Sequence, residues 1–166
     1  MCIRDSSIAA LTAYSAGMVS TGTGIVLTAD GYIVTNAHII AGAEQVNVTL
    51  SDDSLWSAQL VGFEPLEDLA VLKIDASGLT PAQFGDDTLL RSGDPVSAIG
   101  NPMGYRSTIT PGIVSALDQP VSVEGTTMYL LQTSAAINYG SSGGAPSLER
   151  RSPAPPWGSS YAGARG

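Results

Sequence analysis

The sequence predicts an all-β fold, built as barrels or as a sandwich. Short runs rich in β-branched residues recur along the chain, with turn-forming residues between them. The strongest local signal is Asp30-Gly31, because an Asp-Gly pair between two apolar runs is typical of a β-hairpin. Apolar residues do not recur with the helical period, and only residues 86–90 favour a single helical turn.

The expected strands follow in chain order. A strand is predicted within residues 8–19; this mildly apolar run also resembles a poor signal-peptide core, but Asp5 offsets Arg4 in the flank that should be basic. Residues 45–50 alternate polar and apolar side chains, as a half-buried strand does. The other predicted strands are 24–28, 32–35, 57–63, 69–74, 94–99, 109–117 and 128–133, with a loop at 81–87.

Length and composition narrow the class of protein. The chain has 166 residues, enough for one ordinary domain or two small barrels. With 43% hydrophobic and 13% charged residues the composition is that of a globular protein. A net charge of −8 argues against nucleic acid and anionic membranes as partners. One histidine, one cysteine and no H-E-x-x-H motif predict no metal site, no cofactor and no internal disulfide.

The two ends differ in character from the rest of the chain. Residues 1–7 do not continue the strand pattern, and we interpret them as a non-native leader. Residues 149–166 are rich in Pro and Arg and then in Gly, Ser and Ala. A shifted reading frame near residue 146 explains this change, and a native disordered tail is the alternative.

A candidate nucleophile lies in the run Gly140-Ser141-Ser142-Gly143-Gly144. A serine flanked by glycines fits a tight turn in which its own N–H and that of a preceding glycine point to one spot. Acyl-transfer enzymes need this combination of a hydroxyl nucleophile and two donors for an oxyanion. A flexible Gly/Ser linker is the alternative interpretation.

The order of the candidate residues narrows the chemistry further. The only histidine, His38, precedes Ser142, whereas an α/β-hydrolase needs its histidine after the serine. The only cysteine, Cys2, lies in the suspected leader, which argues against a Cys–His enzyme. Asp68 at the start of an apolar run completes the order His…Asp…Ser of chymotrypsin-like proteases. Taken singly, His38 could be an ordinary core or surface histidine and Asp68 a strand-edge carboxylate.

Five segments in this order resemble the signature blocks of the HtrA/Deg family of trypsin-like serine proteases. They are residues 22–27, 30–38 (which end in Thr35-Asn36-Ala37-His38), 68–74, 98–104 and 132–144. The resemblance covers residues 8–145 and implies two chymotrypsin-like β-barrels, at 8–92 and 93–148. Because nothing after Ala145 matches, the second barrel is expected to be incomplete and the domain truncated at its C-terminus.

The resemblance also implies a role for each candidate residue. It places the catalytic triad at His38, Asp68 and Ser142, and the oxyanion hole at the backbone N–H groups of Gly140 and Ser142. Ala136 and Ile137 fall where one wall of the substrate pocket would be. The chain departs from the family at three positions near the nucleophile, with Ser134, Tyr139 and Ser141 in place of Asp, Pro and Asn.

The function implied is hydrolysis of peptide bonds in unfolded proteins, through an acyl-enzyme, by a serine endopeptidase of extracytoplasmic quality control. Family members often form trimers, so a homotrimer is one expected assembly. Two alternatives stay open. The first is a catalytically inactive, protease-like binding domain or fragment, and the second is a plain β-barrel module with a Gly/Ser linker at residues 140–144.

Overall fold

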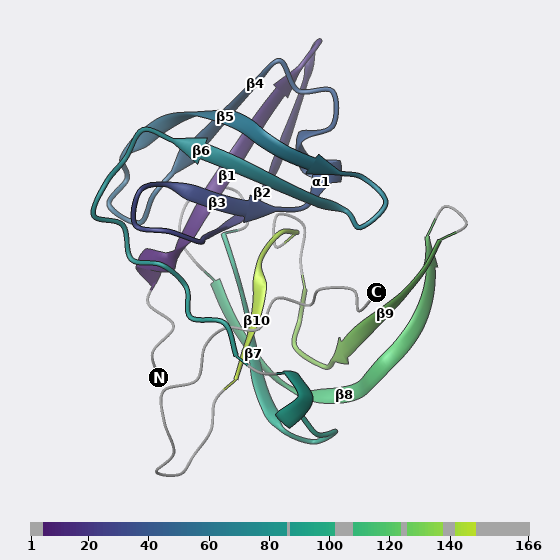
Figure 1. Ribbon diagram of the computed structural model, residues 1–166. Helices are drawn as coiled ribbons and strands as arrows, with labels where there is room; N and C mark the ends of the chain where they lie inside the picture. The colour runs from purple at the N-terminus through teal and green to yellow at the C-terminus, as the bar shows by residue number, and fades with distance from the viewer. Residues whose placement is uncertain (1–4, 86, 102–107, 124–125, 138–141, 149–166) are drawn as a thin grey trace.

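The computed structural model describes residues 5–85, 87–101, 108–123, 126–137 and 142–148. They form a closed six-stranded barrel and a separate four-stranded sheet (Figure 1). The elements in order are η1 (Asp5–Ser7), β1 (Ile8–Ser15), β2 (Met18–Val26), β3 (Tyr32–Thr35), α1 (Ala37–Ile40), β4 (Gln45–Thr49), β5 (Leu55–Glu64), β6 (Leu69–Ile74), η2 (Asp87–Leu89), β7 (Pro95–Gly100), β8 (Thr108–Val123), β9 (Thr126–Thr133) and β10 (Ala145–Leu148). The predicted all-β class, with one complete and one partial unit, is confirmed.

The barrel strands follow the order β1-β2-β3-β6-β5-β4, and antiparallel pairing of β1 with β4 closes the ring. Alternate residues point inward, so that β6 buries Ala70, Leu72 and Ile74. These side chains meet Leu11 and Ile33 in the barrel core. Burial of each large aliphatic side chain contributes roughly 1.5–3 kcal/mol, which makes this core the main source of stability for the first unit.

Two hairpins begin the barrel. The strand predicted within residues 8–19 is confirmed as β1, but the chain reverses at Gly17 (φ 82°), so that Val19 already belongs to β2 and pairs with Tyr14 across the turn. A single glycine in a mildly apolar run gave no clear turn signal. The hairpin predicted at Asp30-Gly31 is confirmed, with Ile25 opposite Val34.

The second sheet has the order β10-β7-β8-β9. The long strand β8 curves through the sheet: its first part pairs with β7 and its second part with β9 (Figure 1). Shifts of register near Ala116 and a positive φ of 51° at Asp118 accompany this curve. Strand β10 pairs with β7 and was not predicted as a strand.

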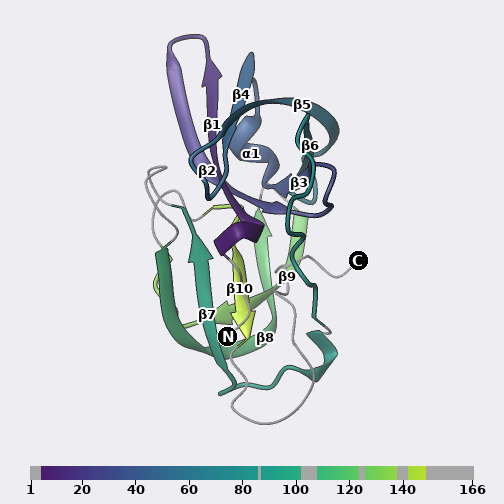
Figure 2. The same ribbon diagram turned by 90° about the vertical axis from the view of Figure 1, so that its left-hand side faces the viewer.

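The two units meet along a joint that is apolar at its centre. Ile8 and Ile25 of the barrel pack with Ile99 of β7. Beside them the Asn101 backbone N–H donates to Thr23 Oγ1 over 2.9 Å. Figure 2 shows the barrel and the second sheet facing each other across this joint. Among the described residues, no helix is long and apolar enough to span a membrane.

Candidate active site

His38 lies on the short helix α1, directly after strand β3. The sequence predicted that His38 follows an apolar strand, as it does, but it did not predict the helix. Four residues are too few to display a helical period in sequence. Ala37, Ile39 and Ile40 are buried in the barrel, which leaves the His38 side chain facing outward. The helix is thus fixed by its apolar residues and presents the imidazole at the surface.

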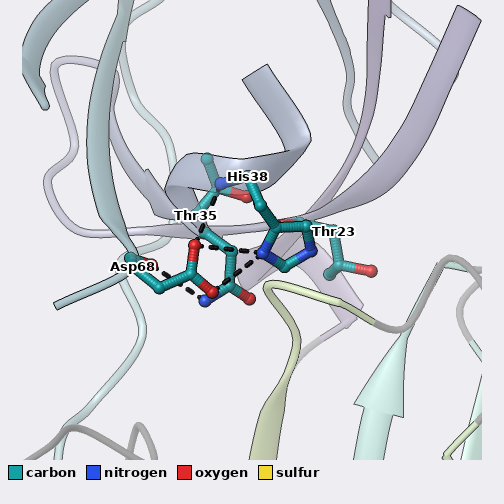
Figure 3. A network of polar contacts seen from close by, with 5 residues as sticks. Thr23, Thr35, His38 and Asp68 are labelled. Atoms are coloured by element: carbon teal, nitrogen blue, oxygen red, sulfur yellow. Dashed lines mark hydrogen bonds and ion pairs between the residues drawn. The ribbon is translucent and has the colours of Figure 1, made fainter. Parts of the chain in front are cut away.

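Asp68 closes the turn that leads into β6 and faces His38 (Figure 3). The His38 Nδ1 atom lies 2.8 Å from Asp68 Oδ2 and 3.0 Å from Oδ1. The His38 backbone N–H donates to Asp68 Oδ1 over 2.9 Å. One carboxylate therefore holds both the ring and the backbone of the histidine, and the structure brings these two predicted residues together.

This geometry determines what the imidazole can do. With Nδ1–H donating to the carboxylate, the neutral ring has its lone pair on Nε2 and can accept a proton there. The two side chains are 58% and 33% exposed, so water screens their attraction. An ion pair this exposed stabilises a fold by less than about 1 kcal/mol. The pair is better suited to orienting the ring than to holding the protein together.

Ser142 is attached to the barrel through its backbone. The Thr23 N–H donates to the Ser142 carbonyl over 2.7 Å, and the Thr35 hydroxyl donates to the Thr23 carbonyl over 2.7 Å. Thr35 is the last residue of β3, just before α1. Two hydrogen bonds thus link Ser142, through Thr23, to the strand that precedes the helix carrying His38. In the described part of the chain, no hydrogen bond joins the Ser142 hydroxyl to His38.

Gly143 makes this attachment close. Its φ is 83°, and a methyl group there would overlap the Thr23 carbonyl oxygen and lie 2.6 Å from Thr35 Oγ1. Only a residue without a side chain allows the segment at Ser142 and Gly143, here called the serine loop, to approach the barrel this closely. No pattern in the sequence indicates these roles of Thr23 and Thr35, because the contacts of Thr23 with Ser142 and Asn101 form only when the two units meet.

The other predicted site residues are placed in part. Ala136 follows β9, and its carbonyl accepts a 2.7 Å hydrogen bond from the Thr110 hydroxyl. Ile137 is 67% exposed. Gly140 of the predicted oxyanion hole lies outside the described residues, as do Tyr139 and Ser141. The suspected leader lies outside them at residues 1–4, and so does the tail at 149–166.

No metal centre forms in the part of the chain that the structure describes. Three or more His, Cys, Asp or Glu side chains do not cluster anywhere among those residues.

Comparison with known proteins finds one matching family and several similar relatives. The family described as "Trypsin-like peptidase domain" matches residues 22–146. The chain is 42% identical over 125 residues to a "Probable periplasmic serine endoprotease DegP-like" of Pseudomonas putida, covering 75% of this chain and 26% of that protein. A protein of the same name from Hahella chejuensis is 43% identical, with the same coverage. The chain thus spans about a quarter of the length of these relatives.

Solved structures resemble the chain in fold as well as in sequence. The structure titled "HtrA-type protease AlgW with tripeptide" has a TM-score of 0.81 and 38% identity, covering 96% of this chain and 55% of its own. A serine endoprotease from Yersinia pestis has a TM-score of 0.76 and 38% identity, covering 87% and 50%.

Proposed function

Because the chain belongs to the trypsin-like peptidase family, we propose that it is a serine endopeptidase of the HtrA type with the triad His38, Asp68 and Ser142. The observation that carries the proposal is the contact of His38 Nδ1 with Asp68 at 2.8 Å. That contact leaves Nε2 as the basic atom of the ring, as general base catalysis by histidine requires.

The proposed reaction passes through an acyl-enzyme. The Ser142 hydroxyl attacks the carbonyl carbon of the scissile peptide bond while His38 Nε2 takes its proton. The N–H groups of Gly140 and Ser142 donate to the oxyanion that forms. The C–N bond then breaks as His38 returns the proton to the leaving amine. Water, activated by the same imidazole, hydrolyses the serine ester and regenerates the enzyme.

The substrate we propose is an extended or unfolded polypeptide. The names of the relatives as serine endoproteases support this class, and one solved neighbour carries a tripeptide. Ala136 and Ile137 are proposed to line one wall of the pocket for a small apolar side chain. By similarity to relatives named as periplasmic, we propose an extracytoplasmic location. A homotrimer is proposed as the assembly from the family resemblance alone.

A second candidate function is a protease-like binding domain without catalysis. It is favoured by one observation: within the described residues the Ser142 hydroxyl does not contact His38 by a hydrogen bond. Catalytic contacts of this kind are often long before substrate binds, so we place this function second.

Labelling with a fluorophosphonate probe separates the two functions. Wild-type protein is expected to react covalently at Ser142, and Ser142→Ala is expected not to react. Asp68→Asn should slow labelling strongly, because the imidazole would lose the carboxylate that fixes its tautomer. A folded wild-type protein that shows no labelling would contradict the protease proposal and support the binding domain.

A further inference from the structure

Asn36 occupies the position before the first residue of α1. An asparagine at this position normally accepts a hydrogen bond from a backbone N–H of the first helical turn. Asn36 has the extended backbone of such a residue, with φ −77° and ψ 141°, but its side chain does not cap the helix. Its Nδ2 instead donates to the backbone carbonyl of Asp68 over 2.9 Å. The Asn36 side chain thus binds a residue 32 positions away and not the helix that it precedes.

The carbonyl that receives this bond belongs to a residue in an unfavourable conformation. Asp68 has φ 51°, in the left-handed region, which residues other than glycine adopt only occasionally. Such a conformation persists only where surrounding contacts fix it. The direction of the Asp68 carboxylate depends on this backbone conformation, because the side chain leaves the chain at the same Cα.

Three consecutive residues supply those contacts. The Asn36 side chain and the Ala37 N–H, at 2.9 and 3.1 Å, donate to the Asp68 carbonyl. The His38 N–H donates to the Asp68 carboxylate at 2.9 Å. Two of the three donors are backbone groups that any residue would provide. The Asn36 amide is the donor that depends on side-chain identity.

We propose that Asn36 is a positioning residue, which holds Asp68 in its left-handed conformation and so aims the carboxylate at His38 Nδ1. This inference rests on the proposed protease function for its effect on catalysis. Asn36 acts on the imidazole through Asp68, so its loss should lower kcat and leave KM nearly unchanged. Misplacement of a catalytic group by about 1 Å costs up to about 10²-fold in rate, and a fall in kcat of about 10- to 100-fold is expected.

Asn36→Ser separates positioning from helix capping. Serine is a good capping residue, but its side chain is too short to reach the Asp68 carbonyl. Asn36→Asp keeps the size and the capping ability and removes the donor. Both variants are expected to lower kcat. The matched control, Asn47→Ser on strand β4, replaces an asparagine in the same barrel and should keep the wild-type kcat. In an Asp68→Asn background, Asn36→Ser should add little further loss, since both act through one carboxylate.

A second readout does not depend on activity. His38 is the only histidine in the chain, so the imidazole gives a single set of NMR resonances. The Nδ1 proton should be observed in wild-type protein and in Asn47→Ser, and should shift and exchange faster in Asn36→Ser and Asn36→Asp. Changes in both kcat and this resonance support the proposal.

Two results would overturn the inference. One is a Nδ1 resonance that both folded Asn36 variants leave unchanged, whatever happens to kcat. The other is wild-type kcat in a variant whose resonance has changed. If the wild-type protein has no peptidase activity, the proposed function fails by itself, and the resonance alone decides whether Asn36 orients Asp68.

Discussion

Gly143→Ala is the sharpest test of how the serine loop is attached to the barrel. A methyl group at this position would overlap the Thr23 carbonyl oxygen and lie 2.6 Å from Thr35 Oγ1. To relieve the overlap, the loop must move away from the barrel. That movement breaks the 2.7 Å hydrogen bond from the Thr23 N–H to the Ser142 carbonyl.

The cost can be built from its parts. An alanine at a φ of 83° costs roughly 1–2 kcal/mol in the folded state. Loss of one hydrogen bond costs about 0.5–1.5 kcal/mol. The sum is a decrease of about 1.5–3.5 kcal/mol in the free energy of unfolding. The smaller conformational freedom of alanine in the unfolded chain offsets about 0.4–1 kcal/mol of this decrease.

Gly17→Ala is the matched control. Gly17 has nearly the same φ, 82°, but nothing lies within 4 Å of a methyl group there. The backbone strain and the unfolded-state term are therefore common to both variants and cancel in their difference. We expect urea denaturation to show Gly143→Ala at least about 1 kcal/mol less stable than Gly17→Ala, the difference being the lost hydrogen bond and the overlap.

The same pair of variants tests the link to chemistry. Displacement of Ser142 should slow fluorophosphonate labelling by up to about 10²-fold in Gly143→Ala, while Gly17→Ala labels at the wild-type rate. Equal stability and equal labelling of the two variants would refute the reasoning, because the close approach of Gly143 to Thr23 would then have no consequence.

Three further predictions follow from single contacts. Thr35→Val should lower the free energy of unfolding by about 1–3 kcal/mol in urea denaturation, because the buried Thr23 carbonyl loses its 2.7 Å donor. Asp68→Asn should lower turnover by about 10⁴-fold in a peptidase assay and change the unfolding free energy by less than about 1 kcal/mol, since the pair is exposed. A hydrogen bond from the Thr28 side chain lowers the pKa of Asp30 below its ordinary 3.8. The stability that this hydrogen bond contributes is complete above the pKa of Asp30 in the unfolded chain and is lost as the pH falls through the lower pKa of the folded state. An NMR titration in which Thr28→Val left the Asp30 midpoint unchanged would contradict the role of Thr28.

Much of the barrel could be predicted because its strands carry their own signals. The alternating residues in 45–50 and the Asp30-Gly31 turn are local features. Such features can be recognised in the sequence without knowledge of the tertiary contacts. The single helical turn expected at 86–90 appears as η2 (Asp87–Leu89). The reversal at Gly17, the four-residue helix α1 and strand β10 were not predicted, because each depends on contacts beyond the segment itself.

Of the candidate site, the pair His38 and Asp68 was predicted, but the contact that Asn36 makes with Asp68 was not. His38 and Asp68 are 30 residues apart, and only the order of the motifs and the family resemblance indicated that they belong to one site. No local pattern indicates that Asp68 adopts a left-handed conformation, so the contact of Asn36 with its carbonyl could not be foreseen. From its position alone Asn36 would be assigned as a helix cap, which the structure contradicts.

The hydrogen bonds of Thr23 bear on when, during synthesis, the residues of the proposed triad can come together. Its N–H binds the Ser142 carbonyl, its carbonyl accepts from Thr35, and its hydroxyl oxygen accepts from the Asn101 N–H. His38 and Asp68 belong entirely to the barrel, whereas Ser142 reaches the barrel only with the second sheet. During synthesis the residues of the barrel, His38 and Asp68 among them, emerge before Ser142. On the proposed triad, a growing chain would stay unable to cut its neighbours until the second unit has docked on Thr23.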